Sequence, residues 1–255
     1  ELRLGGLEIE KNSLNELIHL HRLRTLQLTS CNIVGAEALR PITKLTTVRE
    51  LRISHCQFDE VNLGQLLAKT NSRKVLLEGA SVDDTLLATI EQPNSVEELY
   101  IVFSSVTDKG LECLNHFPRL HTLVLRTDNI TELGLENVLN LINLKRLVVR
   151  SDDVAEDVFA SFRYLKNLEE LSLRQVDLRG EGLQYLGELT ALKRLNIGAY
   201  SDATKPDYAK YRKRIKMEVG NMPSLEELSL RYDGSAIELG DLPRLKVLDL
   251  SNNPV

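Results

Sequence analysis

The sequence contains no tryptophan, little cysteine and no long hydrophobic run. No stretch reaches the ~20 apolar residues that span a bilayer, so we expect no membrane partner. The opening residues, ELRLGGLEIE, are charged and amphipathic, unlike a signal peptide. An odd, small number of cysteines favours a reducing, cytoplasmic compartment over a secreted disulfide framework. No pair of them has the spacing of a zinc site: Cys31, Cys56 and Cys113.

Motifs that carry catalysis are also missing. The sequence has no Gly-x-Ser-x-Gly, no glycine-rich phosphate loop ending in Lys-Ser or Lys-Thr, and no His-Glu-x-x-His. The histidines fall at unrelated positions that do not converge on one site: His19, His21, His55, His116 and His121. We therefore predict a non-enzymatic protein without cofactor or metal. The net charge of -5 gives no overall attraction to nucleic acid, and we expect no nucleic-acid partner.

A repeated unit fills the chain instead. Leucine, two variable residues, leucine, one variable residue and leucine recur about every 24 residues, as in Leu120, Leu123 and Leu125. Such a fixed period predicts a solenoid that functions in binding. Alternation at period two predicts eleven short strands. Their aliphatic pairs are Leu2/Leu4, Leu26/Leu28, Leu51/Ile53, Val75/Leu77, Leu99/Ile101, Leu123/Leu125, Leu147/Val149, Leu171/Leu173, Leu195/Ile197, Leu228/Leu230 and Leu248/Leu250.

A second pattern follows the strands. Apolar residues three apart, such as Leu111, Leu114 and Phe117, predict short helices with one buried face. Thr107 and Thr131 stand where an N-cap is needed. Because helices are wider than strands, the predicted fold is a curved α/β solenoid with a parallel sheet on the concave side and short helices on the convex side.

These residues carry a family resemblance. The chain resembles a leucine-rich repeat protein over essentially its whole length, and Thr107 to Leu114 (TDKGLECL) resemble the start of cysteine-containing, ribonuclease-inhibitor-like repeats. Such repeats occur in F-box substrate receptors of ubiquitin ligases and in intracellular receptors of innate immunity. The resemblance implies a protein-recognition module or scaffold, with one domain of about ten repeats over residues 1–255. Because the chain begins inside a strand motif, we expect it to be excised from a longer protein whose missing domains are further partners.

The expected concave face shows two columns of variable residues. One stripe is apolar or aromatic and predicts an exposed interaction patch: Leu76, Tyr100, Val124 and Val148, with Val102 and Phe103 beside them. The next column is basic: Arg126, Arg150 and Arg174. Asp128, Asp152, Asp153 and Glu170 are candidates to neutralise it internally, and an acidic partner segment is the external alternative. We predict a protein or peptide ligand on this patch. The alternative is that a neighbouring domain of the parent protein covers it.

The period breaks in a basic insertion at residues 199–221. The step from Leu192 to Leu225 is 33 residues instead of 24. The insertion carries Lys210, Arg212, Lys213, Arg214 and Lys216. It predicts either contact with phosphate or nucleic acid, or a solvated helix with Tyr208, Tyr211 and Ile215 packed inward.

The sequence leaves three contexts for the protein open. They are a substrate receptor, the ligand-sensing region of a nucleotide-binding immune receptor, and an anion-sensing module that uses the insertion and the arginine column.

Overall fold

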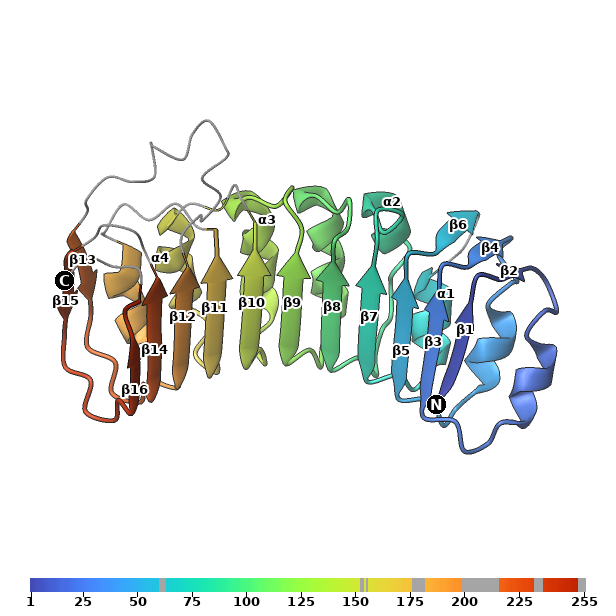
Figure 1. The fold of residues 1–255 in the computed structure, drawn as a ribbon, viewed down its shortest axis with the longest axis horizontal. Helices are drawn as coiled ribbons and strands as arrows, with labels where there is room; N and C mark the ends of the chain where they lie inside the picture. The colour runs from blue at the N-terminus through green and yellow to red at the C-terminus, as the bar shows by residue number, and fades with distance from the viewer. Residues whose placement is uncertain are drawn as a thin grey trace. The chain divides into compact units, whose positions relative to one another are not determined.

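A computed structural model describes residues 1–59, 63–151, 154, 156–175, 182–198, 216–231 and 236–251. The chain folds as two compact units, unit 1 at Glu1–Thr127 and unit 2 at Asp128–Val255. Each unit contains a parallel sheet with short helices on one face (Figure 1). All eleven strands predicted from the leucine repeat are present, and the α/β leucine-rich repeat solenoid expected from the sequence is confirmed.

Unit 1 contains six of these strands, which pair in parallel with every neighbour. Their order is β1 (Leu2–Gly5), β3 (Thr25–Thr29), β5 (Glu50–Ser54), β7 (Lys74–Glu78), β8 (Glu98–Val102) and β9 (Thr122–Arg126). The helices are η1 (Asn15–His19), η2 (Arg40–Lys44), α1 (Leu63–Lys69), α2 (Asp84–Leu87) and η3 (Asp108–His116).

Unit 2 repeats the arrangement with five strands in parallel order. These are β10 (Arg146–Arg150), β11 (Glu170–Arg174), β12 (Arg194–Gly198), β14 (Glu227–Arg231) and β16 (Val247–Asp249). The helices are α3 (Glu132–Leu135), η4 (Glu136–Asn140), η5 (Glu156–Val158), α4 (Phe159–Phe162) and η6 (Gly182–Glu188). Among the described residues, no helix is long and apolar enough to cross a membrane.

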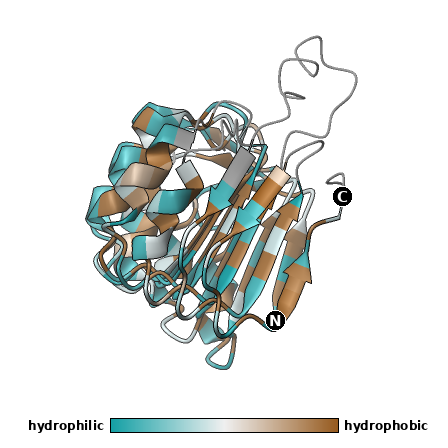
Figure 2. Cartoon of the chain, turned by 90° about the vertical axis from the view of Figure 1, so that its left-hand side faces the viewer, coloured by the Kyte–Doolittle hydropathy of each residue, from teal (hydrophilic) through white to brown (hydrophobic). Residues whose placement is uncertain are grey.

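The core of each unit lies between the sheet and the helices. Strand residues alternate between this core and the opposite face, and Figure 2 shows the resulting alternation of hydrophobic and hydrophilic bands. The aliphatic residues of the inner repeats are almost fully buried, as Leu123 and Leu171 illustrate, whereas Leu248 in the last strand keeps 46% of its surface exposed. Burial of such a side chain stabilises the fold by about 2 kcal/mol, so the leucine repeat supplies most of the driving force.

Many of the helices are tighter than an ordinary α-helix. The segment that contains Leu111 and Leu114 is a 3-10 helix, η3, and α3 continues directly into the 3-10 helix η4. A spacing of three residues matches the three residues per turn of a 3-10 helix, whereas an α-helix repeats every 3.6. The three-residue spacing of the apolar residues is therefore the pattern of a 3-10 helix and not of an α-helix.

The two predicted caps have different outcomes. Thr131 caps α3, because its hydroxyl accepts a hydrogen bond from the backbone N–H of Leu133 at 3.2 Å. Thr107 does not cap η3. Its hydroxyl and its backbone N–H both donate to Asp84 of the preceding repeat, at 2.6 and 2.8 Å. The prediction for Thr107 was wrong because the carboxylate of Asp84, from the preceding repeat, competes for the hydroxyl.

Two smaller sheets accompany the main strands. In unit 1, β2 (Glu8–Ile9), β4 (Asn32–Val34) and β6 (Gln57–Asp59) form a three-stranded parallel sheet just after the main strands. In unit 2, β13 (Lys216–Val219) pairs in parallel with β15 (Ala236–Leu239). Strands of two to four residues carry too little alternation to be recognised in the sequence.

Candidate functional site

The open face of each sheet is the face that no helix covers among the described residues. It is formed by the first, third and fifth residues of the strands. Strand register confirms the columns expected from the sequence. In unit 1, Leu76 pairs with Tyr100 and Tyr100 with Val124, while Val102 pairs with Arg126. In unit 2, Val148 pairs with Ser172, and Arg150 with Arg174.

The apolar stripe is less exposed than predicted. Val102, Val124 and Val148 retain only 8%, 4% and 9% of their surface. Longer side chains flank the valines: Tyr100 and Arg126 stand beside Val102 and Val124 on the same or the adjacent strand, and Arg146 and Arg150 stand on either side of Val148 on its own strand. The expectation of a continuous exposed apolar patch is wrong for the three valines. Only Leu76 and Tyr100 on the strands remain partly exposed.

Tyr100 is held by charged side chains of the same open face. Its hydroxyl donates to a carboxylate oxygen of Glu98 at 2.9 Å. The ammonium group of Lys74 lies 5.0 Å from the centre of the Tyr100 ring, within cation–π range. Lys74 also lies 3.7 Å from both Glu50 and Glu98. These contacts fix the ring in one orientation, so its exposed part is presented at little further entropic cost.

Phe103 is the most exposed aromatic side chain at this site. It keeps 57% of its surface and follows directly after β8. Its backbone has φ +51°, in the left-handed region that a bulky residue rarely adopts. The backbone N–H of Phe103 donates to the carbonyl of Arg126 at 2.7 Å, which holds this conformation. The same left-handed conformation and backbone bond recur just after other strands, as at Ser30 and His55, so they belong to the turn of the repeat, and the exposed aromatic ring is what marks Phe103 as a functional candidate.

The arginine column is present and exposed. Arg126 belongs to unit 1, and Arg150 and Arg174 are adjacent in unit 2. Within the described part of the chain, no carboxylate forms an ion pair with Arg126 or Arg174. The Nε of Arg150 donates to the side-chain oxygen of Gln175. The column therefore offers guanidinium groups that a carboxylate or phosphate can bind.

Glu170 does not neutralise this column, which corrects one expectation. It is the first residue of β11 and Arg174 the last, so the two side chains lie on the same face but at opposite ends of the strand. Its carboxylate bonds Arg146 at 2.9 Å and Arg194 at 2.8 Å, one on each adjacent strand. Burial alone would raise the pKa of Glu170, but hydrogen bonds from Arg194 and then Arg146 outweigh burial and lower it. Asp128 forms no ion pair with the described residues, and Asp152 and Asp153 lie outside them.

Replacement of Glu170 by glutamine is expected to lower the free energy of unfolding by about 1–2 kcal/mol at pH 7, after allowance for solvent screening. A folded-state pKa below the unfolded value near 4.3 means that Glu170 stabilises the fold above about pH 4 and less as the pH falls. Urea unfolding at pH 7 and pH 3.5 should show a smaller pH dependence for Glu170→Gln than for wild type. The more exposed Glu169→Gln is the control, with a loss below about 1 kcal/mol. Equal losses at both pH values for Glu170→Gln would contradict the assignment.

The basic insertion lies mostly outside the described residues. This applies to Lys210, Arg212, Lys213 and Arg214, and to the helix predicted around Tyr208, Tyr211 and Ile215. Lys216 begins strand β13. The final part of the insertion is therefore extended and pairs with β15.

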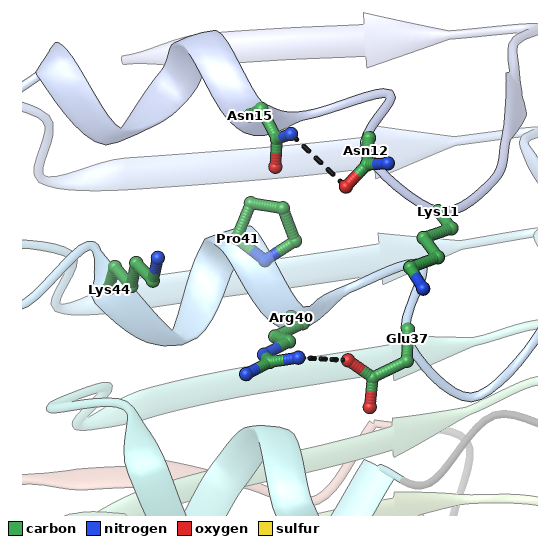
Figure 3. Close-up of a pocket in the computed structure, with 7 residues that line it drawn as sticks. All are labelled: Lys11, Asn12, Asn15, Glu37, Arg40, Pro41 and Lys44. Carbon is green, nitrogen blue, oxygen red and sulfur yellow. Dashed lines mark hydrogen bonds and ion pairs between the residues drawn. The ribbon is translucent and has the colours of Figure 1, made fainter.

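A polar hollow of 260 Å³ lies on the helix side of unit 1 (Figure 3). Its lining is basic overall, but Figure 3 shows Glu37 paired with Arg40 at 2.7 Å and Asn15 bonded to Asn12 at 3.2 Å. Apart from Pro41 the lining side chains are exposed, so water competes for their charges. The residues are Lys11, Asn12, Asn15, Glu37, Arg40, Pro41 and Lys44.

The three cysteines are free and buried. Burial raises the pKa of Cys56 to about 11 and that of Cys113 to about 12. Thiols with such pKa values hold almost no thiolate near neutral pH and are poor nucleophiles. Among the described residues, no group of three or more histidine, cysteine or acidic side chains is placed to hold a metal ion.

Comparisons with known proteins extend the fold assignment. No protein-family model matches the chain, and no curated protein matches it in sequence. An internalin from Listeria monocytogenes is similar in structure, with a TM-score of 0.50, 17% identity, and coverage of 98% of this chain and 81% of that one. The TLR13–ssRNA13 complex gives a TM-score of 0.57, with 16% identity over 100% of this chain and 43% of that one. The Drosophila Toll–Spatzle complex gives 0.53, with 11% identity over 98% and 40%. The chain thus spans less than half the length of the TLR13 and Toll chains.

Proposed function

Because the chain adopts the leucine-rich repeat fold, we propose that it is a non-enzymatic recognition module that binds a protein or peptide on its open face. The observation that carries this proposal is Phe103, an aromatic residue that keeps 57% of its surface exposed. It accompanies two other groups suited to binding, the fixed ring of Tyr100 and the guanidinium of Arg126, which forms no ion pair with the described residues. Aromatic and arginine side chains dominate the binding energy of protein interfaces. We call Leu76, Tyr100, Phe103 and Arg126 the β8 patch.

Charge on the open face favours a protein ligand over a nucleic acid. In unit 2, Glu170 and Glu227 alternate with Arg146 and Arg194 along the first column. A continuous polyanion laid along this face would meet carboxylates at every second strand, which costs binding energy. A polypeptide, in contrast, can carry acidic groups opposite the unpaired arginines and neutral groups opposite the carboxylates. The TLR13 structure holds single-stranded RNA and the Toll structure holds Spatzle, and we propose a polypeptide ligand for this chain.

The cellular context is part of the same proposal. Three buried free thiols suit a reducing compartment, and we propose a cytoplasmic location. We further propose that the module serves as the substrate-recognition or ligand-sensing part of a larger protein. The ubiquitin-ligase receptor and the immune receptor are the two settings that the sequence resemblance suggests.

Affinity capture from a lysate, followed by mass spectrometry, tests the function. We expect the wild-type chain to retain a defined set of proteins, and the Tyr100→Ala, Arg126→Glu variant of the β8 patch to lose them. Tyr164→Ala is the matched control, because Tyr164 is an exposed aromatic residue just after helix α4, with 62% of its surface accessible. Circular dichroism and urea unfolding check that each variant is folded. Retention of the same proteins by the open-face variant, and their loss from Tyr164→Ala, would move the site to the helix side.

A further inference from the structure

The arginine column of unit 2 is interrupted by a single glycine. Arg174 on β11 pairs in register with Gly198 on β12, and Gly198 pairs with Arg231 on β14. In the adjacent column, Ser172 pairs with Asn196 and Asn196 with Ser229. Gly198 therefore leaves a gap in the column of arginines, and the side-chain amide of Asn196 is next to this gap in the adjacent column. We call Arg174, Asn196, Gly198 and Arg231 the Gly198 notch.

No atom of the described residues fills the gap. If Gly198 carried a Cβ atom, the nearest atom outside its chain neighbours would be Cγ of Arg174, at 4.0 Å. Adjacent strands are ~4.8 Å apart, so the arginines that border the notch stand on strands about 10 Å apart. A carboxylate or phosphate group fits between two guanidinium groups at that separation and can contact both of them.

Hydrogen-bond donors around the notch are left without partners. Arg174 forms no ion pair, and the Asn196 side chain no hydrogen bond, with any residue that the structure describes. Arg231 uses its Nε and Nη2 on one oxygen of Asp249, at 3.0 and 2.6 Å, which leaves Nη1 available. The adjacent Ser229 hydroxyl is buried without a partner among the described residues. Hydrogen-bond donors without partners cost free energy, and an anion bound at this place would supply the missing acceptors.

We propose that the Gly198 notch binds one oxyanion of an extended polypeptide ligand, either an acidic side-chain carboxylate or a side-chain phosphate. Arg174 and Nη1 of Arg231 hold two of its oxygens, and the Asn196 amide donates to it from the floor. This inference rests on the proposed recognition function and identifies one group that the ligand must carry. It concerns residues distinct from the β8 patch.

The surrounding acids limit the site to a single anion. Asp249 stays ionised, because hydrogen bonds from Ser251 and then Arg231 hold its pKa well below its usual range. Glu170 stays ionised for the reason given above, and Glu227 belongs to the same column. Asp249 borders the notch through its bonds to Arg231, whereas Glu170 and Glu227 stand at the other end of their strands on the same face, and all three repel further negative charge along that face. A peptide with one acidic or phosphorylated side chain satisfies this arrangement, whereas a nucleic acid with a phosphate at every nucleotide does not.

The test titrates the full chain, isotopically labelled, with three blocked glycine pentapeptides whose central residue is aspartate, phosphoserine or serine. NMR follows the backbone N–H of Gly198, the side-chain amide of Asn196 and the Nε–H of Arg174. We expect saturable shifts at these three groups with the aspartate or the phosphoserine peptide and none with serine. Whichever of the two binds more tightly identifies the source of the oxyanion.

Two variants and a matched control separate the notch from general attraction between charges. Gly198→Val fills the notch, and Arg174→Gln removes one charge while keeping a similar shape. Each is expected to raise the dissociation constant at least about tenfold, the effect of losing one charge-assisted hydrogen bond. Arg150→Gln removes the same charge one strand further away and is expected to change it less than about twofold. If Gly198→Val fails to fold, Arg174→Gln still decides the question.

Three results would overturn the inference. They are the absence of saturable shifts with either anionic peptide, equal weakening by Arg150→Gln and Arg174→Gln, and tighter binding of a single-stranded RNA oligonucleotide at the same three groups. The proposed function has a separate readout. If partner capture depends on the β8 patch but is unaffected by Arg174→Gln, the recognition function stands and the notch assignment fails.

Discussion

Replacing Phe103 by glycine is expected to weaken ligand binding about 30-fold or more while leaving the fold intact. An exposed aromatic anchor typically contributes 2 kcal/mol or more to a protein interface, which corresponds to this factor. Glycine adopts φ +51° without strain, so removal of the ring relieves about 1 kcal/mol of backbone strain. The greater flexibility of glycine in the unfolded chain offsets that gain. The free energy of unfolding should therefore stay within about 1 kcal/mol of wild type.

The matched control is Ser30→Gly. Ser30 also follows a strand of unit 1 and has φ +53°, so the backbone change is the same but no aromatic ring is lost. Binding of a captured partner, measured by calorimetry, should be unchanged in this control. Equal affinity of wild type and Phe103→Gly would show that the β8 patch is not the binding site. A large loss of stability in Phe103→Gly would show that the ring packs against the fold instead of awaiting a partner.

Replacing Gly64 by alanine is expected to destabilise unit 1 by about 3 kcal/mol or more. Gly64 lies in helix α1, and a Cβ atom at this position would be 1.6 Å from the carbonyl oxygen of Thr89 and 2.9 Å from the Cα of Ile90. Both atoms belong to rigid backbone just after α2, so the two repeats must separate to admit a methyl group. Overpacking in a filled core costs typically 1–3 kcal/mol and more where backbone must move. Separation would also break the bond from the Gly64 N–H to the Thr89 hydroxyl at 3.1 Å.

Urea unfolding measures this effect directly. Gly5→Ala is the control, because a Cβ atom at Gly5 would meet only the carbonyl oxygen of Thr29, at an ordinary distance of 3.5 Å. We expect it to change the free energy of unfolding by less than about 1 kcal/mol. If Gly64→Ala were tolerated as well as Gly5→Ala, helix α1 could not pack against the end of α2 as described. The stacking of adjacent repeats in unit 1 would then need revision.

The repeated leucines predicted the strands and their register because each repeat can bury its aliphatic residues in only one way. Leu76, Tyr100 and Val124 pair as the sequence columns indicated. The exposure of the open face was harder to predict, because it depends on the relative lengths of adjacent side chains. Val124 is buried for this reason although its column faces away from the core.

Partner choice among charged residues was equally inaccessible from the sequence. Glu170 was a candidate partner for the arginine column, but it bonds Arg146 and Arg194, its direct register partners on the two flanking strands. The Gly198 notch left a trace in the sequence, as glycine replaces arginine at one step of the column. The trace becomes interpretable only when register shows which side chains surround the gap. The left-handed backbone of Phe103 cannot be read from phenylalanine itself, which such a position disfavours, and its sequence signal is the glycine at the same place in other repeats, Gly6 and Gly79.

Site-specific photo-crosslinking tests the central claim, ligand binding on the open face, most directly. A benzophenone amino acid would replace Phe103 on the open face in one protein and Tyr164 near helix α4 in another, two aromatic positions with similar exposure of 57% and 62%. Both proteins would be irradiated in lysate, and the crosslinked products identified by mass spectrometry. We predict that position 103 crosslinks one defined protein, and that the same protein is absent from the products of position 164. Crosslinking of the partner from position 164 and not from position 103 would contradict the account.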